Sequence, residues 1–220
     1  MPHKTTVSPE EVLGAIYGKT SVETGLSEKR RDELIAAAIY ASFRNQEFGT
    51  RLRFPADYRL EDWKNDAAGI DVIVKDRSGR EKKLQIKGVY IQRSIERRRK
   101  HSTAGGPAIA GRRTQRMIRR DSEELTRIME HELSKIIQDY SGLILIIHVI
   151  ADFATQTSLE IAIRSSFKIV ANLKAREVWF MRQVPVRLIH GHRSARLNSY
   201  AYNLFKVSPD RRTYGFCFTL

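Results

Sequence analysis

The sequence predicts an α/β fold, with a central mixed β-sheet and helices on both sides. Three observations lead there: a long helical pattern, a Val- and Ile-rich hairpin, and then an alternation of helical and apolar strand patterns. The chain has 220 residues and is 41% hydrophobic, which is enough apolar material for one sizeable core. We predict an N-terminal lead-in over residues 1–27 and a single domain over residues 28–220.

The first half of the predicted domain contains a helix followed by a hairpin. Ser27 is a predicted N-cap for a helix at 28–45, because Leu and Ile recur there at three- and four-residue steps among alanines. Residues 70–76 and 82–92 are rich in Val and Ile, and the Ser78-Gly79 turn between them predicts a β-hairpin. At most a short strand is expected at 50–54.

The second half alternates between helical and strand patterns. An apolar stripe predicts a helix at 121–140, begun by Asp121 or Ser122 as the cap. A near-continuous apolar run at 143–151 suits a strand covered on both faces, with His148 inside it as a core histidine. A helix at 158–175 and a strand at 177–183 are then expected, and the C-terminal residues show no clear pattern.

The charge of the chain constrains its partners. Lys and Arg number 39 against 25 Asp and Glu, which gives a formal charge of +14. Nucleic acid is the commonest polyanion for such a surface. The longest apolar run is too short to cross a bilayer, and no signal peptide is evident, so no membrane partner is expected. Cys217 is the one cysteine and cannot form an internal disulfide, which is typical of a cytoplasmic protein.

Residues 93–120 form a segment of distinct composition. It holds ten Lys or Arg against one acid, around a Gly- and Ala-rich centre, which predicts a basic mobile loop. The alternative is a surface insertion without function. We expect its cations to bind phosphates of nucleic acid: Arg97, Arg98, Arg99, Lys100, Arg112, Arg113, Arg116, Arg119 and Arg120. A further nucleic-acid face could include Arg193, Arg196, Tyr200 and Tyr202. Tyrosines two apart on a strand, however, more often pack within a sheet.

The hairpin carries the candidate chemistry. Residues two apart on a strand share a face, so Gln85 and Lys87 point the same way, and a turn centred on Ser78 places Asp71 opposite Gln85. A carboxylate, an amide oxygen and the Ile86 carbonyl suit a hard cation such as Mg²⁺. Such a cation polarises a phosphoryl oxygen and lowers the pKa of bound water, and Lys87 can stabilise charge developing on phosphate. Each residue alone is better explained as a turn or a solvated strand face.

The sequences GIDVIV and LQIKG resemble the PD-(D/E)XK nuclease superfamily, in the Gln-x-Lys variant found in restriction endonucleases and Holliday-junction resolvases. Ile70 stands where that family has Pro, and Gln85 replaces the second acid. The resemblance implies a restriction-endonuclease-like core, with Glu33 on the preceding helix as a further metal ligand. Glu47, Asp62 and Asp66 compete with Glu33 for that role.

The resemblance further implies a Mg²⁺-dependent endonuclease that hydrolyses phosphodiester bonds of double-stranded or branched DNA, with Mn²⁺ as a substitute. A homodimer is implied if two strands are cut. The alternative is a non-catalytic DNA- or RNA-binding protein that keeps the fold, and an RNA-directed nuclease differs only in substrate. His190 and His192 are two apart and could bind a metal, but no cysteine or acid cluster completes a zinc site beside them.

Overall fold

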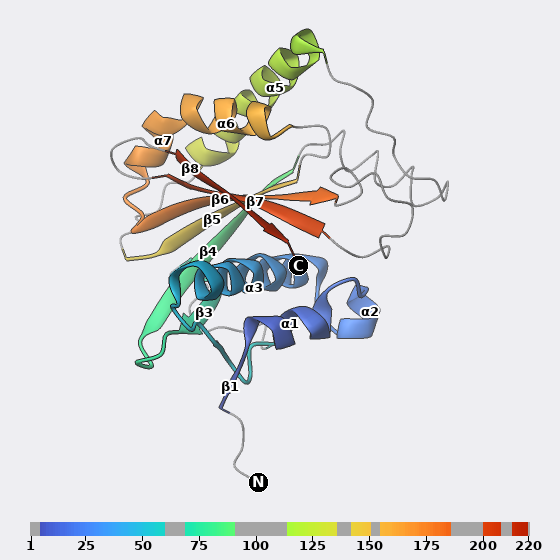
Figure 1. Ribbon diagram of the computed structural model, residues 1–220, viewed down its shortest axis with the longest axis vertical. Coiled ribbons are helices and arrows are strands. Elements are labelled where there is room, and N and C mark those ends of the chain that lie inside the picture. Colours follow the sequence, from blue (N-terminus) through green and yellow to red (C-terminus); the bar gives the residue numbers. More distant parts are fainter. Residues whose placement is uncertain are drawn as a thin grey trace. The chain divides into compact units, whose positions relative to one another are not determined.

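The computed structural model describes residues 5–59, 69–90, 114–135, 142–150, 155–185, 200–207 and 213–219 (Figure 1). Its strands β3 to β8 form a mixed six-stranded sheet in the order β3-β4-β5-β6-β7-β8, which confirms the α/β prediction. The chain divides into two compact units. The first comprises residues 1–87, 140–146 and 175–177, and the second comprises residues 88–139, 147–174 and 178–220.

The first unit is built on the long helix α3 (Glu28–Phe48). The Ser27 side chain accepts from the Arg30 N–H and begins this helix as predicted, while Gly49 ends it at φ 60°, a left-handed conformation that favours glycine. Helix α1 (Pro9–Ile16) lies along α3 in Figure 1 and buries Val12 and Ile16. The described part of the predicted lead-in, which also contains β1 (Thr6–Val7) and α2 (Ser21–Thr24), therefore belongs to this unit.

Strands complete the first unit. Strand β2 (Phe54–Pro55) pairs with β1, and β3 (Val72–Lys75) pairs antiparallel with β4 (Glu81–Tyr90), which passes into the second unit after Lys87. The predicted strand at 50–54 is confined to its last residue, because Arg53 makes only an isolated bridge to Lys75. Val72, Val74, Leu84 and Ile86 are buried, as their alternation predicted.

The second unit contains helices α5 (Gln115–Ser134), α6 (Gln156–Ser165) and α7 (Phe167–Asn172). The predicted basic loop therefore ends earlier than expected: residues 115–120 are helical, and Thr114, not Asp121 or Ser122, is the cap. The predicted helix at 158–175 is two helices. It breaks at Ser166, whose hydroxyl and backbone N–H both donate to the Ala162 carbonyl, and such a side-chain bond tends to bend a helix.

The remaining strands are β5 (Ile144–Ile150), β6 (Glu177–Pro185), β7 (Tyr200–Val207) and β8 (Thr213–Thr219). Strands β6, β7 and β8 pair antiparallel in sequence, and their buried aromatic residues, Trp179, Phe180, Tyr202 and Phe205, form much of the core. Asn203 on β7 donates to Gln156 at the start of α6. Among the described helices, none has both the length and the apolar character that crossing a bilayer requires.

Candidate functional site

The β3–β4 hairpin has the register that its sequence predicted. Val72 pairs with Leu84 and Lys75 with Glu81, so the pairing is centred on Ser78. Asp76 closes the turn, because its Oδ1 accepts from the backbone N–H groups of Ser78 at 2.9 Å and Arg80 at 3.0 Å. Gly79 follows with φ 78°, a conformation that a side chain would strain. This register puts Asp71 level with Gln85, one position beyond the last ladder pair.

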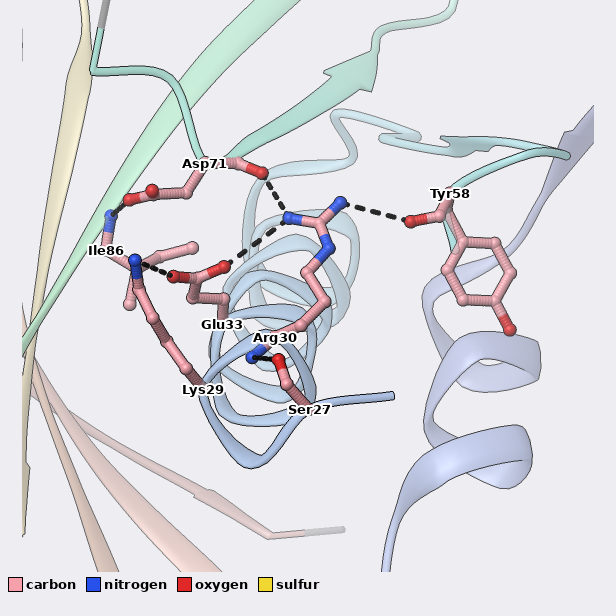
Figure 2. Close-up of polar contacts among 7 residues, drawn as sticks. All are labelled: Ser27, Lys29, Arg30, Glu33, Tyr58, Asp71 and Ile86. Carbon is pink, nitrogen blue, oxygen red and sulfur yellow. Dashed lines mark hydrogen bonds and ion pairs between the residues drawn. The ribbon is translucent and has the colours of Figure 1, made fainter. Parts of the chain in front are cut away.

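Asp71 is held by the neighbouring strand through both its backbone and its side chain. Its N–H donates to the Leu84 carbonyl at 3.0 Å. Its Oδ2 accepts from the Ile86 N–H at 2.7 Å, which Figure 2 shows as a short bridge between the two residues. The carboxylate thus takes the place that a strand carbonyl would otherwise fill for the buried Ile86. Asp71 is therefore fixed in orientation at the point where β3 begins.

Gln85 differs from an ordinary glutamine on a strand face. The residue is only 2% exposed, and its Oε1 is buried without a hydrogen-bond partner. Leaving such an oxygen unsatisfied costs about 1–3 kcal/mol. Lys87, two positions along on the same face, is half-buried. Burial raises the pKa of the Asp71 carboxyl, and the positive charge of Lys87 opposes that rise.

Glu33 reaches the same place from helix α3. Its carboxylate lies 3.5 Å from Nη1 of Arg30 and 3.6 Å from Nζ of Lys29, on the turn before it (Figure 2). Arg30 is buried, and Nη1 also donates to the Asp71 backbone carbonyl while Nη2 donates to the Tyr58 carbonyl at 3.2 Å. The head of Lys29 is exposed. The guanidinium of Arg30 thereby links the helix to the strand that carries Asp71.

Both carboxylic acids have a raised pKa, and the Asp71 charge contributes to the rise at Glu33. Burial raises the pKa of Glu33, and the neighbouring Asp71 carboxylate raises it further, against the smaller opposing effects of Lys29 and Arg30. Burial also raises the pKa of Asp71, and the Ile86 N–H, Lys87, Lys29 and Arg30 oppose it in that order. Burial raises the pKa of both acids, and the Asp71 charge adds to the rise at Glu33, so an additional cation nearby is favoured.

Among the competing acids, Glu47 is the one that the structure describes, and it does not join this site. Glu47 is exposed and lies 14 residues beyond Glu33, or about 21 Å along the helix at 1.5 Å per residue. Asp62 and Asp66 lie outside the described residues. The Ile86 main chain takes part through its N–H, and a role for its carbonyl as a ligand stays a prediction. The part of the chain that the structure describes contains no group of three or more His, Cys, Asp or Glu placed to hold a metal.

The histidine and tyrosine predictions have separate outcomes. His148 is buried on β5, as expected of a core residue. Tyr202 is 1% exposed, so it packs in the sheet and offers no surface to nucleic acid. His190, His192, Arg193 and Arg196 lie outside the described residues, as does the side chain of Cys217.

The predicted phosphate-binding cations are described only in part. Arg116, Arg119 and Arg120 are exposed on the first turns of α5, where Arg119 pairs with Glu123 at 3.0 Å. The others lie outside the described residues: Arg97, Arg98, Arg99, Lys100, Arg112 and Arg113. The three described arginines therefore stand on a helix, which holds their backbone spacing constant.

Sequence reasoning missed Lys29 and Arg30 as neighbours of the carboxylates. Both precede Glu33 by one helical turn, so the spacings i+4 and i+3 already brought them to its side of the helix. The basic run in which they stand resembles a solvated helix face, and nothing in it indicates that Arg30 is buried.

No protein-family model, curated protein or solved structure matches the chain.

Proposed function

We propose that the chain is a divalent-metal-dependent nuclease that hydrolyses phosphodiester bonds of DNA. The observation that carries the proposal is that Arg30 contacts both the Glu33 carboxylate and the Asp71 backbone, while Gln85, level with Asp71 on β4, keeps a buried amide oxygen without a hydrogen-bond partner. Mg²⁺ and Mn²⁺ prefer carboxylate and amide oxygens, and a buried amide oxygen without a hydrogen-bond partner is suited to be a ligand of such a cation. The donor set therefore fits the metal that the hairpin motif implies.

The proposed roles of the side chains follow from their positions. Asp71, Glu33 and Gln85 hold the cation, which when bound polarises the phosphate and lowers the pKa of a coordinated water. The Ile86 N–H fixes the Asp71 carboxylate, so its oxygens are oriented before substrate arrives. Lys87 stands on the same strand face and stabilises the negative charge that grows on the phosphate oxygens as water attacks phosphorus and the P–O bond breaks.

DNA as the substrate is supported by charge. The formal charge of +14 suits a polyanion, and Arg116, Arg119 and Arg120 offer exposed cations for its phosphates. Double-stranded and branched DNA are both consistent with phosphate contacts, because such contacts carry no sequence information. A homodimer follows only if the enzyme cuts both strands of its substrate.

A second candidate function is a non-catalytic nucleic-acid-binding protein. One observation favours it: Lys29, Arg30 and Lys87 already surround the two carboxylates with positive charge, so a metal has to compete with three cations of the chain itself. In that case the carboxylates have a structural role, and the chain binds DNA or RNA without cutting it.

Replacement of Gln85 by leucine separates the two functions. If Gln85 is a metal ligand, Gln85→Leu weakens Mn²⁺ binding, measured by calorimetry, by about tenfold or more, the scale on which metal sites respond to loss of a partner. It also raises the free energy of unfolding without metal by about 1 kcal/mol, because the orphaned oxygen is gone and leucine has similar size. Gln46→Leu, at an exposed position of α3, is the matched control and should change neither quantity.

Two outcomes of the Mn²⁺ titration would contradict the proposed metal site. If wild-type protein binds no Mn²⁺ or Mg²⁺ in the millimolar range but still binds DNA, the nuclease proposal is wrong and the binding protein is favoured. If wild-type protein binds Mn²⁺ and Gln85→Leu binds it equally well, the metal lies elsewhere than at this strand.

A further inference from the structure

Arg30 has an unusual environment for an arginine in a basic stretch of helix. Its side chain is 7% exposed, whereas the preceding Lys29 is 81% exposed. Among the groups that the guanidinium contacts are the Glu33 carboxylate at 3.5 Å, the Asp71 carbonyl and the Tyr58 carbonyl at 3.2 Å. These contacts join helix α3 to the segment before β3 and to the turn around Tyr58 (Figure 2).

The chemistry of arginine matters for this arrangement. A buried charge is costly unless it is paired and hydrogen-bonded, and the Arg30 charge is matched by Glu33 and by two carbonyl dipoles. Only a planar guanidinium presents donors that diverge toward acceptors on different segments. A lysine in the same place has one nitrogen at the end of a flexible chain and cannot bridge Asp71 and Tyr58 in the same way.

Both candidate metal ligands depend on these contacts. Arg30 bonds to the backbone of Asp71, whose own carboxylate is bonded to Ile86, so the residue is fixed from two sides. On Glu33, Arg30 contacts Oε2, whereas Lys29 lies near Oε1. Arg30 also contributes to lowering the pKa of both acids, against the larger effect of burial.

We propose that Arg30 is a positioning residue, which holds the Asp71 backbone and the Glu33 carboxylate in the arrangement that a bound divalent cation requires. This role rests on the proposed function, because it assigns Arg30 to the same site. Arg30 itself is not a ligand, since a guanidinium has no lone pair to donate.

Two effects of Arg30 on metal binding oppose one another, and the experiment has to separate them. Its positive charge repels a divalent cation, so charge alone predicts tighter binding when Arg30 is removed. Its hydrogen bonds orient the ligands, so positioning predicts weaker binding. Loss of groups that orient metal ligands typically costs 10- to 100-fold in affinity, and we expect positioning to dominate.

The test compares Arg30→Met and Arg30→Lys with Arg44→Met as the matched control. Arg44 stands on the same helix and pairs with Glu177 at 3.2 Å, so its removal also breaks a partly buried ion pair, but away from Asp71. We expect Arg30→Met to weaken Mn²⁺ binding by about tenfold or more. Arg30→Lys should resemble Arg30→Met, because it keeps the charge and loses the divergent donors, whereas Arg44→Met should bind Mn²⁺ as wild type does.

A second measurement does not involve metal. The Ile86 amide proton is bonded to Asp71, so hydrogen exchange at that amide reports whether Asp71 stays in place. In metal-free protein we expect exchange at Ile86 to become about tenfold faster in Arg30→Met than in Arg44→Met, compared at equal global stability by adjusting the urea concentration. A purely structural role predicts equal exchange rates in the two variants.

The outcomes distinguish this proposal from the proposed function. Tighter or unchanged Mn²⁺ binding in Arg30→Met overturns the positioning role but leaves the metal site in place. Wild-type Mn²⁺ affinity in Arg30→Lys would show that Arg30 acts through its charge and not through its divergent donors. If wild-type protein binds no Mn²⁺, the proposed function fails, and exchange at Ile86 alone decides whether Arg30 holds Asp71. Equal exchange in the two methionine variants contradicts the proposal in every case.

Discussion

Replacing Asp71 by alanine or by asparagine separates its two roles, as a hydrogen-bond acceptor and as a charge. Alanine removes the acceptor of the Ile86 N–H, which then lies buried without a partner. Asparagine keeps a side-chain oxygen in the same place and removes only the charge. Both variants lose the carboxylate that the proposed metal site requires.

The expected stabilities follow from these contacts. A buried N–H without a partner costs about 1–3 kcal/mol, so the free energy of unfolding of Asp71→Ala should be lower than that of Asp71→Asn by this amount. Asp71→Asn also removes a buried negative charge whose pKa is raised mainly by burial and which in turn raises the pKa of Glu33. It should therefore be at least as stable as wild type at neutral pH. A difference of about 1.5 kcal/mol corresponds to about 3–6 °C in Tm for a chain of this size.

The assay is thermal unfolding at pH 7.5 without metal, followed by Mn²⁺ titration of the same samples. We expect the order of Tm to be Asp71→Asn at or above wild type, with Asp71→Ala lowest, and we expect neither variant to bind Mn²⁺ as wild type does. Equal Tm values for the alanine and asparagine variants would show that the Asp71–Ile86 bond contributes nothing. Wild-type Mn²⁺ affinity in Asp71→Asn would remove Asp71 from the site.

Three further predictions concern charge. Lys87→Ala should lower turnover by about two to four powers of ten without weakening Mn²⁺ binding, and a loss of Mn²⁺ affinity with unchanged turnover at saturating metal refutes the role. The raised pKa of Glu33 means that the folded state binds its proton more tightly, so the stability that this residue contributes is full below pH 4.5 and is lost as pH rises through the raised value. Glu33→Gln should therefore be more stable than wild type in urea at pH 7.5 without metal and similar at pH 4, and equal curves at both pH values contradict this. Replacing Arg116, Arg119 and Arg120 together by Gln should flatten the salt dependence of DNA affinity by up to about 2–3 units of log–log slope, and an unchanged slope places the DNA surface elsewhere.

The hairpin was the most predictable part of the structure. The alternation of Val72 and Val74 with Leu84 and Ile86, around a turn with Gly79, left one register that buries every apolar side chain. The position of Asp71 follows from that register, and the shared face of Gln85 and Lys87 follows from the period of a strand. Local rules were sufficient because each of these relations spans only a few residues.

Other features depended on tertiary packing. Gln85 and Arg30 are buried because other parts of the fold cover them. Their polar side chains gave no indication of this burial in the sequence. The start of α5 was predicted too late because Arg116, Arg119 and Arg120 resemble a loop in composition, although Thr114 is a good N-cap. Strands β7 and β8 were missed because their alternation is loose and strand pairing decides their conformation, β7 with β6 and β8 with β7.

The central claim, that Glu33, Asp71 and Gln85 hold a divalent cation for DNA hydrolysis, is tested most directly by a cleavage assay. Wild-type protein, Asp71→Asn and Arg44→Met are incubated with plasmid duplex and with branched DNA, in Mg²⁺, in Mn²⁺ and in excess EDTA. We predict cleavage by wild type and Arg44→Met in either metal, none in EDTA, and none by Asp71→Asn, although Asp71→Asn still binds DNA. Cleavage in EDTA or by Asp71→Asn would contradict the claim, as would intact DNA in both metals with wild-type protein bound to it.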